Sequence, residues 1–209
     1  MTTIAVVAGG LREPSSTRLL ADRLAGAVRA NLPAAELKVF ELRKYGRSVM
    51  DMMLTGFATS DLEQVFETLA DADALIAVTP AFNASFSGLF KSFFDVLPEG
   101  TLKDMPVLIG ATGGTERHSL VLEHALRPMF SYLHTMVSPT AVYAATDDFG
   151  GAGSLTLSGR IEKAAAEFVR LIVSCGARQR FVEGADDLNE MQRLLRGLDD
   201  PHAISERDL

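Results

Sequence analysis

Short apolar runs alternate along the chain with segments whose apolar residues recur at helical spacing. The apolar runs lie at 3–9, 36–42, 73–79, 105–112 and 136–144. Helical periodicity marks the segments at about 15–32, 60–71, 86–97, 117–134 and 155–175. Runs that are apolar at nearly every position suit parallel strands covered by helices on both faces. The alternation therefore predicts an α/β fold with a doubly wound, five-stranded parallel sheet.

Two stretches fall outside this alternation. Residues 43–60 show no clear period, so we expect a long loop there, whose run of methionines would belong either to the core or to an oligomer surface. Residues 186–196 carry a short helical pattern that leads into a polar tail. No linker composition divides the chain. We therefore expect one domain over residues 1–185, with 186–209 as an appendage to it.

Composition narrows the classes of protein. With 47% hydrophobic and 22% charged residues, the 209-residue chain is typical of a folded globular domain. A net charge of −7 without a Lys/Arg cluster argues against nucleic acid as a partner. Cys175 is the only cysteine and lies in an apolar string, so we expect a buried core residue and no disulfide. The N-terminus lacks a signal-peptide pattern and no apolar run reaches membrane-spanning length, which favours a cytoplasmic protein without a membrane partner.

The loop after the first strand has the composition of an anion site. In a doubly wound sheet, ligands bind beyond the carboxyl ends of the strands, where this loop, GGLREPSSTR at 9–18, lies. Its glycines allow a close backbone approach, and Ser15, Ser16 and Thr17 offer hydroxyls beside the free N–H groups of a helix start. Arg12 adds a planar fork suited to phosphate oxygens. A simple N-cap with a surface arginine would explain one serine but not three consecutive hydroxyl residues.

Two later loops suit a flat ligand. In TPAFNASFSG, at 79–88, Phe82 presents an apolar face, and Asn83 and Ser85 offer polar groups to ring heteroatoms or a phosphate. A capped helix start would explain the second half of this loop but not its first half. In ATGGT, at 111–115, Gly113 and Gly114 let a ring lie against main-chain amides. A phosphate at one side and a planar heterocycle between the other two loops describe FMN.

Other common chemistries lack their motifs. Neither G-x-x-x-x-G-K-[ST] nor G-x-G-x-x-G follows a predicted strand, which disfavours an ATPase or a standard dinucleotide site. The histidines at 118, 124, 134 and 202 lack the helical spacing of a metal-binding pair, so we expect no metal site. The G-x-S-x-G of a serine hydrolase is absent as well.

Three motifs carry a resemblance to a known family. AGGLREPSSTRLL, TPAFNASFSGLFKSFFDVLP and ATGGTERHSLVLEHALRP resemble the signature loops of the NAD(P)H-dependent FMN reductases, which have a flavodoxin-like fold. The resemblance covers residues 3 to about 175 and points to reductases that supply reduced flavin to two-component monooxygenases of the alkanesulfonate and luciferase-like type. It implies hydride transfer from NADPH, or from NADH, to FMN. Members are commonly dimers or tetramers, so we expect a homo-oligomer.

The resemblance also implies which residues bind FMN. The phosphate meets the main chain at Gly10 and the side chains of Arg12, Ser15, Ser16 and Thr17. Because the family usually has serine at the position of Gly10, we expect one hydroxyl contact fewer and flavin that comes and goes. The ribityl chain and ring edge lie against Pro80, Phe82, Asn83, Ala84 and Ser85. The isoalloxazine faces Thr112, Gly113, Gly114 and Thr115. The N–H groups of the Gly113-Gly114 loop would act electrostatically, and no catalytic acid or base is assigned.

Several questions stay open from the sequence. The chain could instead keep FMN and reduce quinones, or act as a flavodoxin-type electron carrier, although no Trp and three Tyr fit a carrier less well. No loop reads clearly as a 2′-phosphate site, so the nicotinamide preference is undetermined. His118 lies either near the ligand or on the surface of a helix start. His124 occupies a place where related reductases carry an aromatic residue at a helix irregularity on the subunit interface, and Arg127-Pro128 predicts such a disturbance.

Overall fold

A parallel sheet forms the centre of the protein. The computed structural model describes residues 1–150 and 153–178, so the predicted helix at 186–196 and the boundary at 185 lie outside the described residues. The strands run in the order β2-β1-β3-β5-β6, and the last position is shared by β6 and β7, which both pair with β5. Their bounds are β1 Thr3–Ala8, β2 Glu36–Glu41, β3 Ala74–Phe82, β5 Pro106–Gly113, β6 Met136–Val137 and β7 Val142–Ala145. This order confirms the doubly wound, flavodoxin-like α/β fold.

The predicted fifth strand at 136–144 is not continuous. Residues 138–141 separate β6 from β7, and Pro139 within this break has no N–H to give to the ladder. The guanidinium of Arg127 donates instead to the carbonyl oxygens of Ser138 and Pro139, each at 3.1 Å. The prediction of one strand was wrong because proline interrupts an otherwise apolar run.

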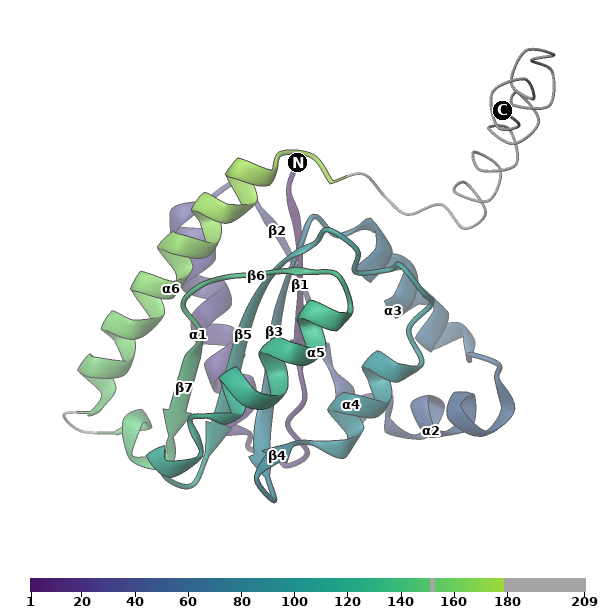
Figure 1. Ribbon diagram of the computed structural model, residues 1–209, viewed down its shortest axis with the longest axis horizontal. Coiled ribbons are helices and arrows are strands. Elements are labelled where there is room, and N and C mark those ends of the chain that lie inside the picture. Colours follow the sequence, from purple (N-terminus) through teal and green to yellow (C-terminus); the bar gives the residue numbers. More distant parts are fainter. Residues whose placement is uncertain (151–152, 179–209) are drawn as a thin grey trace, which may run out of the picture.

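Helices cover both faces of the sheet. Figure 1 shows α1 (Ser16–Asn31) and α6 (Gly153–Cys175) together on one side, with α3 (Ser60–Asp71) and α4 (Gly88–Asp95) on the other. Alternate residues of the strands serve two separate cores, so that in β1 the side chains of Ala5 and Val7 enter one and those of Ile4, Val6 and Ala8 the other. The central strands β1, β3 and β5 therefore face a core on both sides, which explains why they are apolar at nearly every position, whereas the edge strand β2 carries exposed and charged residues.

The stretch predicted as a long loop contains a helix, α2 (Gly46–Thr55). It ends at Gly56, whose left-handed φ of 78° lets its N–H donate to the carbonyl of Met52. The prediction of a loop was wrong. Val49 is the one buried residue of the helix, and Met52 packs against the core while partly exposed, so few side chains of α2 are fully buried. Met50 and Met53 are each 47% exposed and lie on the surface rather than in the core.

The segment predicted as a helix at 117–134 is irregular. It consists of a 3₁₀ turn at Glu116–His118, a π-helical turn at Leu122–Leu126 and the short helix α5 (Arg127–Tyr132). Pro128 stands in the first turn of α5, directly after the π turn, where its missing N–H is tolerated. This confirms the predicted helix irregularity around His124.

Cys175 at the end of α6 is half-buried, less than predicted, and its Sγ lies 3.5 Å from Sδ of Met136. Burial raises the pKa of this thiol. Among the described residues, no helix combines the length and the apolarity needed to cross a membrane.

Candidate functional site

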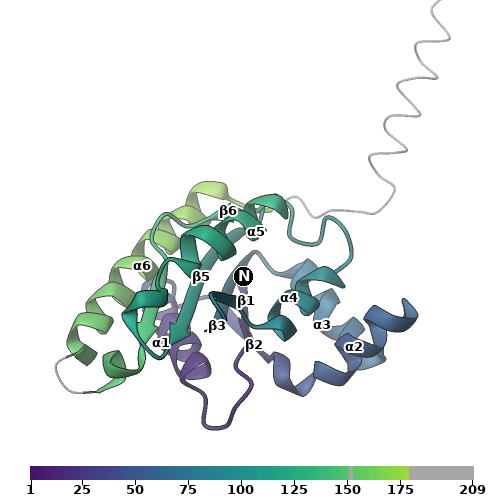
Figure 2. The same cartoon turned by 60° about the horizontal axis from the view of Figure 1, so that its bottom comes forward.

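A cavity of 750 Å³ lies at the carboxyl ends of the strands. Figure 2 brings this end forward and shows the loop after β1, in purple, projecting beyond the sheet. The three loops predicted from the sequence meet here, together with a fourth segment that follows β7. The lining consists of Gly10, Leu11, Arg12, Pro14, Ser15, Ser16, Thr17, Leu19, Pro80, Ala81, Phe82, Thr112, Gly113, Gly114, Thr146 and Phe149.

The first loop gives the cavity a positive end. Ser15 caps α1, and its Oγ accepts a hydrogen bond from the N–H of Arg18 at 3.2 Å. The N–H groups of Ser16 and Thr17, in the same turn, have no partners within the helix and are available to an anion. Arg12 is exposed and makes no ion pair with another described residue. Among the described residues, no Asp or Glu lines the cavity, although the whole chain carries a net charge of −7.

Gly10 is required by a close approach within this loop. A Cβ at this position would lie 2.1 Å from Oγ of Ser15, far inside van der Waals contact. The hydroxyl of Ser15 therefore occupies the space that any side chain at position 10 would need. That FMN has one hydroxyl contact fewer at Gly10 stays a prediction.

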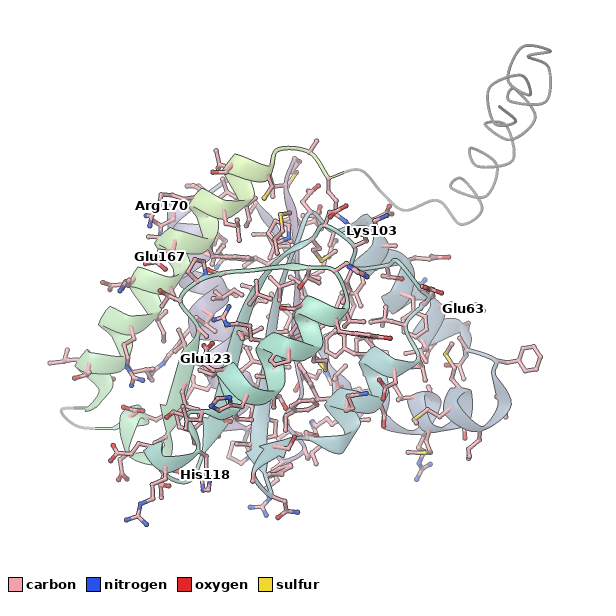
Figure 3. All side chains as sticks on the ribbon, in the orientation of Figure 1. Glu63, Lys103, His118, Glu123, Glu167 and Arg170 are labelled. Carbon is pink, nitrogen blue, oxygen red and sulfur yellow. The ribbon has the colours of Figure 1, made fainter. Side chains whose placement is uncertain are left out.

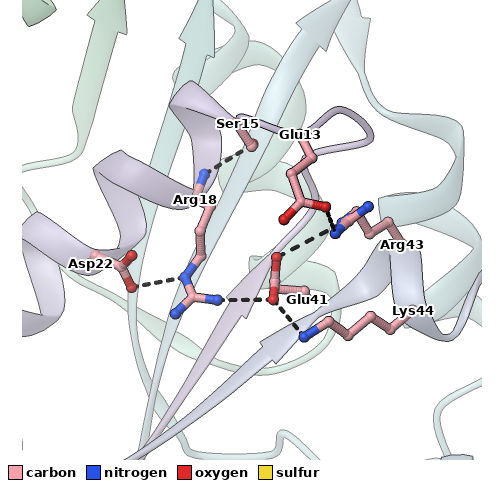
Figure 4. Close-up of polar contacts among 7 residues, drawn as sticks. All are labelled: Glu13, Ser15, Arg18, Asp22, Glu41, Arg43 and Lys44. Atoms are coloured by element: carbon pink, nitrogen blue, oxygen red, sulfur yellow. Dashed lines mark hydrogen bonds and ion pairs between the residues drawn. The ribbon is translucent and has the colours of Figure 1, made fainter.

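A charge network fixes the back of the first loop (Figure 4). Arg18 pairs with Glu41 at the end of β2 at 3.0 Å, and Lys44 reaches the same carboxylate at 2.7 Å. Arg43 forms an ion pair with Glu13 in the loop itself. The hydrogen bond from Lys44, followed by the nearby charges of Lys44, Arg18 and Arg43, lowers the pKa of Glu41 despite its partial burial. The network joins the loop after β1 to the segment that follows β2.

Thr17 links the first loop to the third. Its Oγ1 lies 2.8 Å from Oγ1 of Thr112, and both residues are buried. That the Thr17 side chain binds phosphate stays a prediction, because either hydroxyl can be the donor in this bond and Thr17 keeps its O–H when Thr112 donates. Thr17 also offers its main-chain N–H in the first turn of α1.

The second loop is a tight hairpin. Strand β3 continues to Phe82 and returns as β4 (Ser85–Phe86), with Asn83 and Ala84 at φ values of 47° and 64°. Two consecutive left-handed residues are typical of a two-residue hairpin turn. Pro80 and Phe82 line the cavity, and the side chain of Phe82 is 44% exposed. Asn83, Ala84 and Ser85 lie outside the lining, at the tip and on the returning strand.

A smaller cavity of 220 Å³ lies on the other side of this hairpin. It shares Ala81 with the larger cavity and is also lined by Ala84, Arg117, His118, Leu120, Val121, His124 and Ala125. Figure 3 shows His118 at the same end of the molecule as the β4 turn, with Lys103 and Arg170 toward the opposite end. The two histidines whose roles the sequence left open therefore lie beside the main cavity.

Tyr143 on β7 supports the third loop. Its hydroxyl donates to the carbonyl oxygen of Thr115 at 2.7 Å, and a Cβ at Gly113 would lie 2.1 Å from this hydroxyl. Gly113 and Gly114 line the cavity, whereas Thr115 does not. Burial, with a smaller contribution from the charge of Asp148, raises the pKa of Tyr143, so the phenol stays protonated and able to donate. Sequence reasoning did not identify Tyr143.

The fourth segment, Thr146–Phe149, was also missed. It forms a 3₁₀ turn directly after β7, and both end residues line the cavity. The guanidinium of Arg23 lies 5.6 Å from the centre of the Phe149 ring, in cation–π geometry. The rule that ligands bind beyond the carboxyl ends of strands would have found this segment, had it been applied after the fifth strand as well.

Together these features define a class of protein. The cavity has a positive helix-start end, two partly exposed aromatic residues and a glycine loop, and its volume lies in the range of cofactor sites. Its donor set fits a phosphate, and the glycine loop leaves room for a flat ring against the main chain. The fold is that of a flavodoxin-like protein, and the cavity has the features expected of a site for a planar ligand with a phosphate.

Comparison with known proteins identifies the family. Residues 2–149 match the model of the NADPH-dependent FMN reductases, and the chain belongs to this family. An FMN reductase (NADPH) of Pseudomonas aeruginosa is 37% identical over 146 residues, which cover 70% of this chain and 78% of that protein. An NADH-dependent FMN reductase of Pseudomonas putida is 34% identical over 80% of this chain and 91% of its own length. The crystal structure of an oxidoreductase from Corynebacterium diphtheriae superposes with a TM-score of 0.80 at 44% identity, covering 83% of this chain and 98% of that one.

Proposed function

We propose that the main cavity binds FMN, with the phosphate at the start of α1 and the isoalloxazine between the hairpin after β3 and the glycine loop after β5. The chain is an NAD(P)H-dependent FMN reductase, as its family and relatives indicate. The observation that supports this placement is the charge pattern of the lining: its described residues include Arg12 and a helix start but no carboxylate. The phosphate is the one doubly charged group of FMN and belongs at that end.

Different residues of the cavity bind the phosphate, stabilise charge on the ring and exclude water. FMN, when bound, accepts hydride from the nicotinamide and, with one proton, becomes reduced FMN while NAD(P)H becomes NAD(P)⁺. Arg12 and the first turn of α1 hold the phosphate and thereby orient the ring. The amides of Gly113 and Gly114 donate to the ring where negative charge develops. Phe82 and Phe149 provide apolar surface beside the ring and exclude water from it.

We also propose that reduced FMN leaves the chain and supplies a separate flavin-dependent monooxygenase. Arg12 is the one cationic side chain among the described residues of the lining, which supports modest phosphate affinity and exchange of the flavin. We further propose a homo-oligomer that uses the surface around the π turn, because Leu120 is 60% and Tyr132 is 83% exposed there.

The test separates release from retention. The purified chain is loaded with FMN and passed through a desalting column, and NADPH or NADH oxidation is then measured with FMN or a quinone as acceptor. We expect the column to strip most of the flavin and turnover to require added FMN. Adding a flavin-dependent monooxygenase and its substrate should then yield oxygenated product. Flavin that stays bound while quinone is reduced faster than FMN would overturn the release proposal.

A further inference from the structure

The glycine loop that would face the flavin ring is held from behind by one side chain. Tyr143 donates to the carbonyl of Thr115 at 2.7 Å, just beyond the two glycines that line the cavity. The same hydroxyl stands 2.1 Å from the Cβ position of Gly113. One phenol therefore both anchors the loop through Thr115 and restricts position 113 to glycine.

Tyr143 is itself fixed by its neighbours. It is 5% exposed, and its strand β7 is in register with β5, so that Ala144 pairs with Thr112 and Ala145 with Gly113. Its side chain belongs to the core on the same face as that of Ala111. Burial and strand register hold the Tyr143 hydroxyl in place, so we expect the loop of residues 113–115 to take the shape that its hydrogen bond requires.

An ion pair secures the strand end that carries this tyrosine. Arg160 on α6 donates to the main-chain carbonyl of Tyr143 at 2.6 Å and to the carboxylate of Asp148 at 2.8 Å. Asp148 accepts in turn from the N–H of Ala145 at 2.8 Å. The backbone on either side of Tyr143 is thus tied to helix α6 and to the turn that contributes Phe149 to the cavity.

We propose that Tyr143 is the positioning residue for the flavin ring, because it holds the loop of residues 113–115 in the shape that turns its amides toward the isoalloxazine. This inference rests on the proposed placement of FMN. Tyr143 does not line the cavity and takes no part in the hydride transfer itself. Its removal should therefore change how FMN is bound rather than whether the protein folds.

The test compares Tyr143→Phe with Tyr45→Phe as a matched control. Tyr45 is half-buried, lies between β2 and α2 and does not line the cavity, so the same loss of a hydroxyl there should leave the flavin unaffected. Binding of FMN is followed by quenching of its fluorescence, and the visible absorption of bound FMN reports the ring's surroundings. We expect Tyr143→Phe to weaken FMN binding about three- to tenfold, the range of one lost hydrogen bond, and to shift the absorption band. In Tyr143→Phe, kcat should fall more than the KM for NADPH rises, since the orientation of the flavin ring affects the chemical step.

A second pair of variants tests the steric part. Gly113→Ala should weaken FMN binding more than Tyr143→Phe, since its methyl group cannot coexist with the hydroxyl in the present loop shape. Adding Tyr143→Phe to Gly113→Ala removes the contact at 2.1 Å and leaves the ring carbon at 3.2 Å, so binding should partly recover. The comparison of FMN binding between Gly113→Ala and the double variant stays informative even if Tyr143→Phe lowers the melting temperature, because a loss of stability alone would not improve binding.

The outcomes are distinct. Wild-type affinity and an unchanged spectrum in Tyr143→Phe, or no recovery in the double variant, would overturn the role of Tyr143 while leaving the proposed function intact. A wild-type chain that binds no FMN would overturn both.

Discussion

Replacing Gly10 with alanine tests the geometry of the phosphate end. The new Cβ would lie 2.1 Å from Oγ of Ser15, so either the serine rotates away or the loop moves. If Ser15 rotates, it loses its cap bond to the N–H of Arg18, which costs about 1 kcal/mol. If the loop moves, Arg12 and the first turn of α1 no longer converge on one point. We expect the loss to fall mainly on FMN binding, by about tenfold, which corresponds to ~1.4 kcal/mol.

Two measurements distinguish these effects. Fluorescence titration gives the Kd for FMN, and thermal unfolding should show a Tm lower by about 2–4 °C for each kcal/mol lost. The double variant Gly10→Ala/Ser15→Gly removes the clashing hydroxyl while glycine remains a tolerated N-cap, so FMN binding should improve over Gly10→Ala alone.

Gly26→Ala provides the matched control. Gly26 is an exposed position within α1, and a Cβ there meets no atom within 4 Å. The same substitution at this position should stabilise the helix by up to about 1 kcal/mol and leave FMN binding unchanged. Wild-type affinity and Tm in Gly10→Ala would refute the argument that Ser15 excludes a side chain at position 10.

Three further predictions concern other parts of the site. Thr17→Val and Thr112→Val should each cost about 1–3 kcal/mol by leaving a buried hydroxyl unpartnered, and the double variant should cost less than the sum in urea unfolding. The pKa of Glu41 is lowered by Lys44 first and Arg18 next, so its ionised carboxylate stabilises the fold at pH values above the ordinary pKa of Glu. This stabilisation is lost as the pH falls through the lowered pKa. The gap in unfolding free energy between wild type and Glu41→Gln should therefore close in acid, and a gap independent of pH would contradict this. His124→Ala should change the size-exclusion volume or flavin retention; no change in either would count against its role in association.

The fold was predictable because its strands are buried on both faces. Residues 74–78 are apolar at every position, which leaves few alternatives to a parallel sheet covered by helices. The segments that were predicted wrongly lack this signal. Helix α2 buries Val49 alone, and Pro139 interrupts the fifth strand within an apolar run.

The site was predictable as far as it depends on strand ends. Arg12 follows β1, and Phe82 and Gly113 are the last residues of β3 and β5, so their meeting at one edge of the sheet follows from the topology. Side-chain contacts between segments that are distant in sequence cannot be read from the sequence pattern in this way. The place of Tyr143 behind Gly113, and of Thr112 against Thr17, depends on strand register and packing that spacing alone does not encode.

The most direct measurement is anaerobic mixing of the purified chain with FMN and either NADPH or NADH, followed by the visible absorption of oxidised flavin. We predict that this band bleaches and that NAD(P)⁺ forms in an amount equal to the FMN reduced. Arg12→Ala should slow the bleaching at low FMN concentration, and saturating FMN should restore most of the rate. Flavin that binds in the cavity but stays oxidised with both nicotinamides would contradict the function proposed for this site.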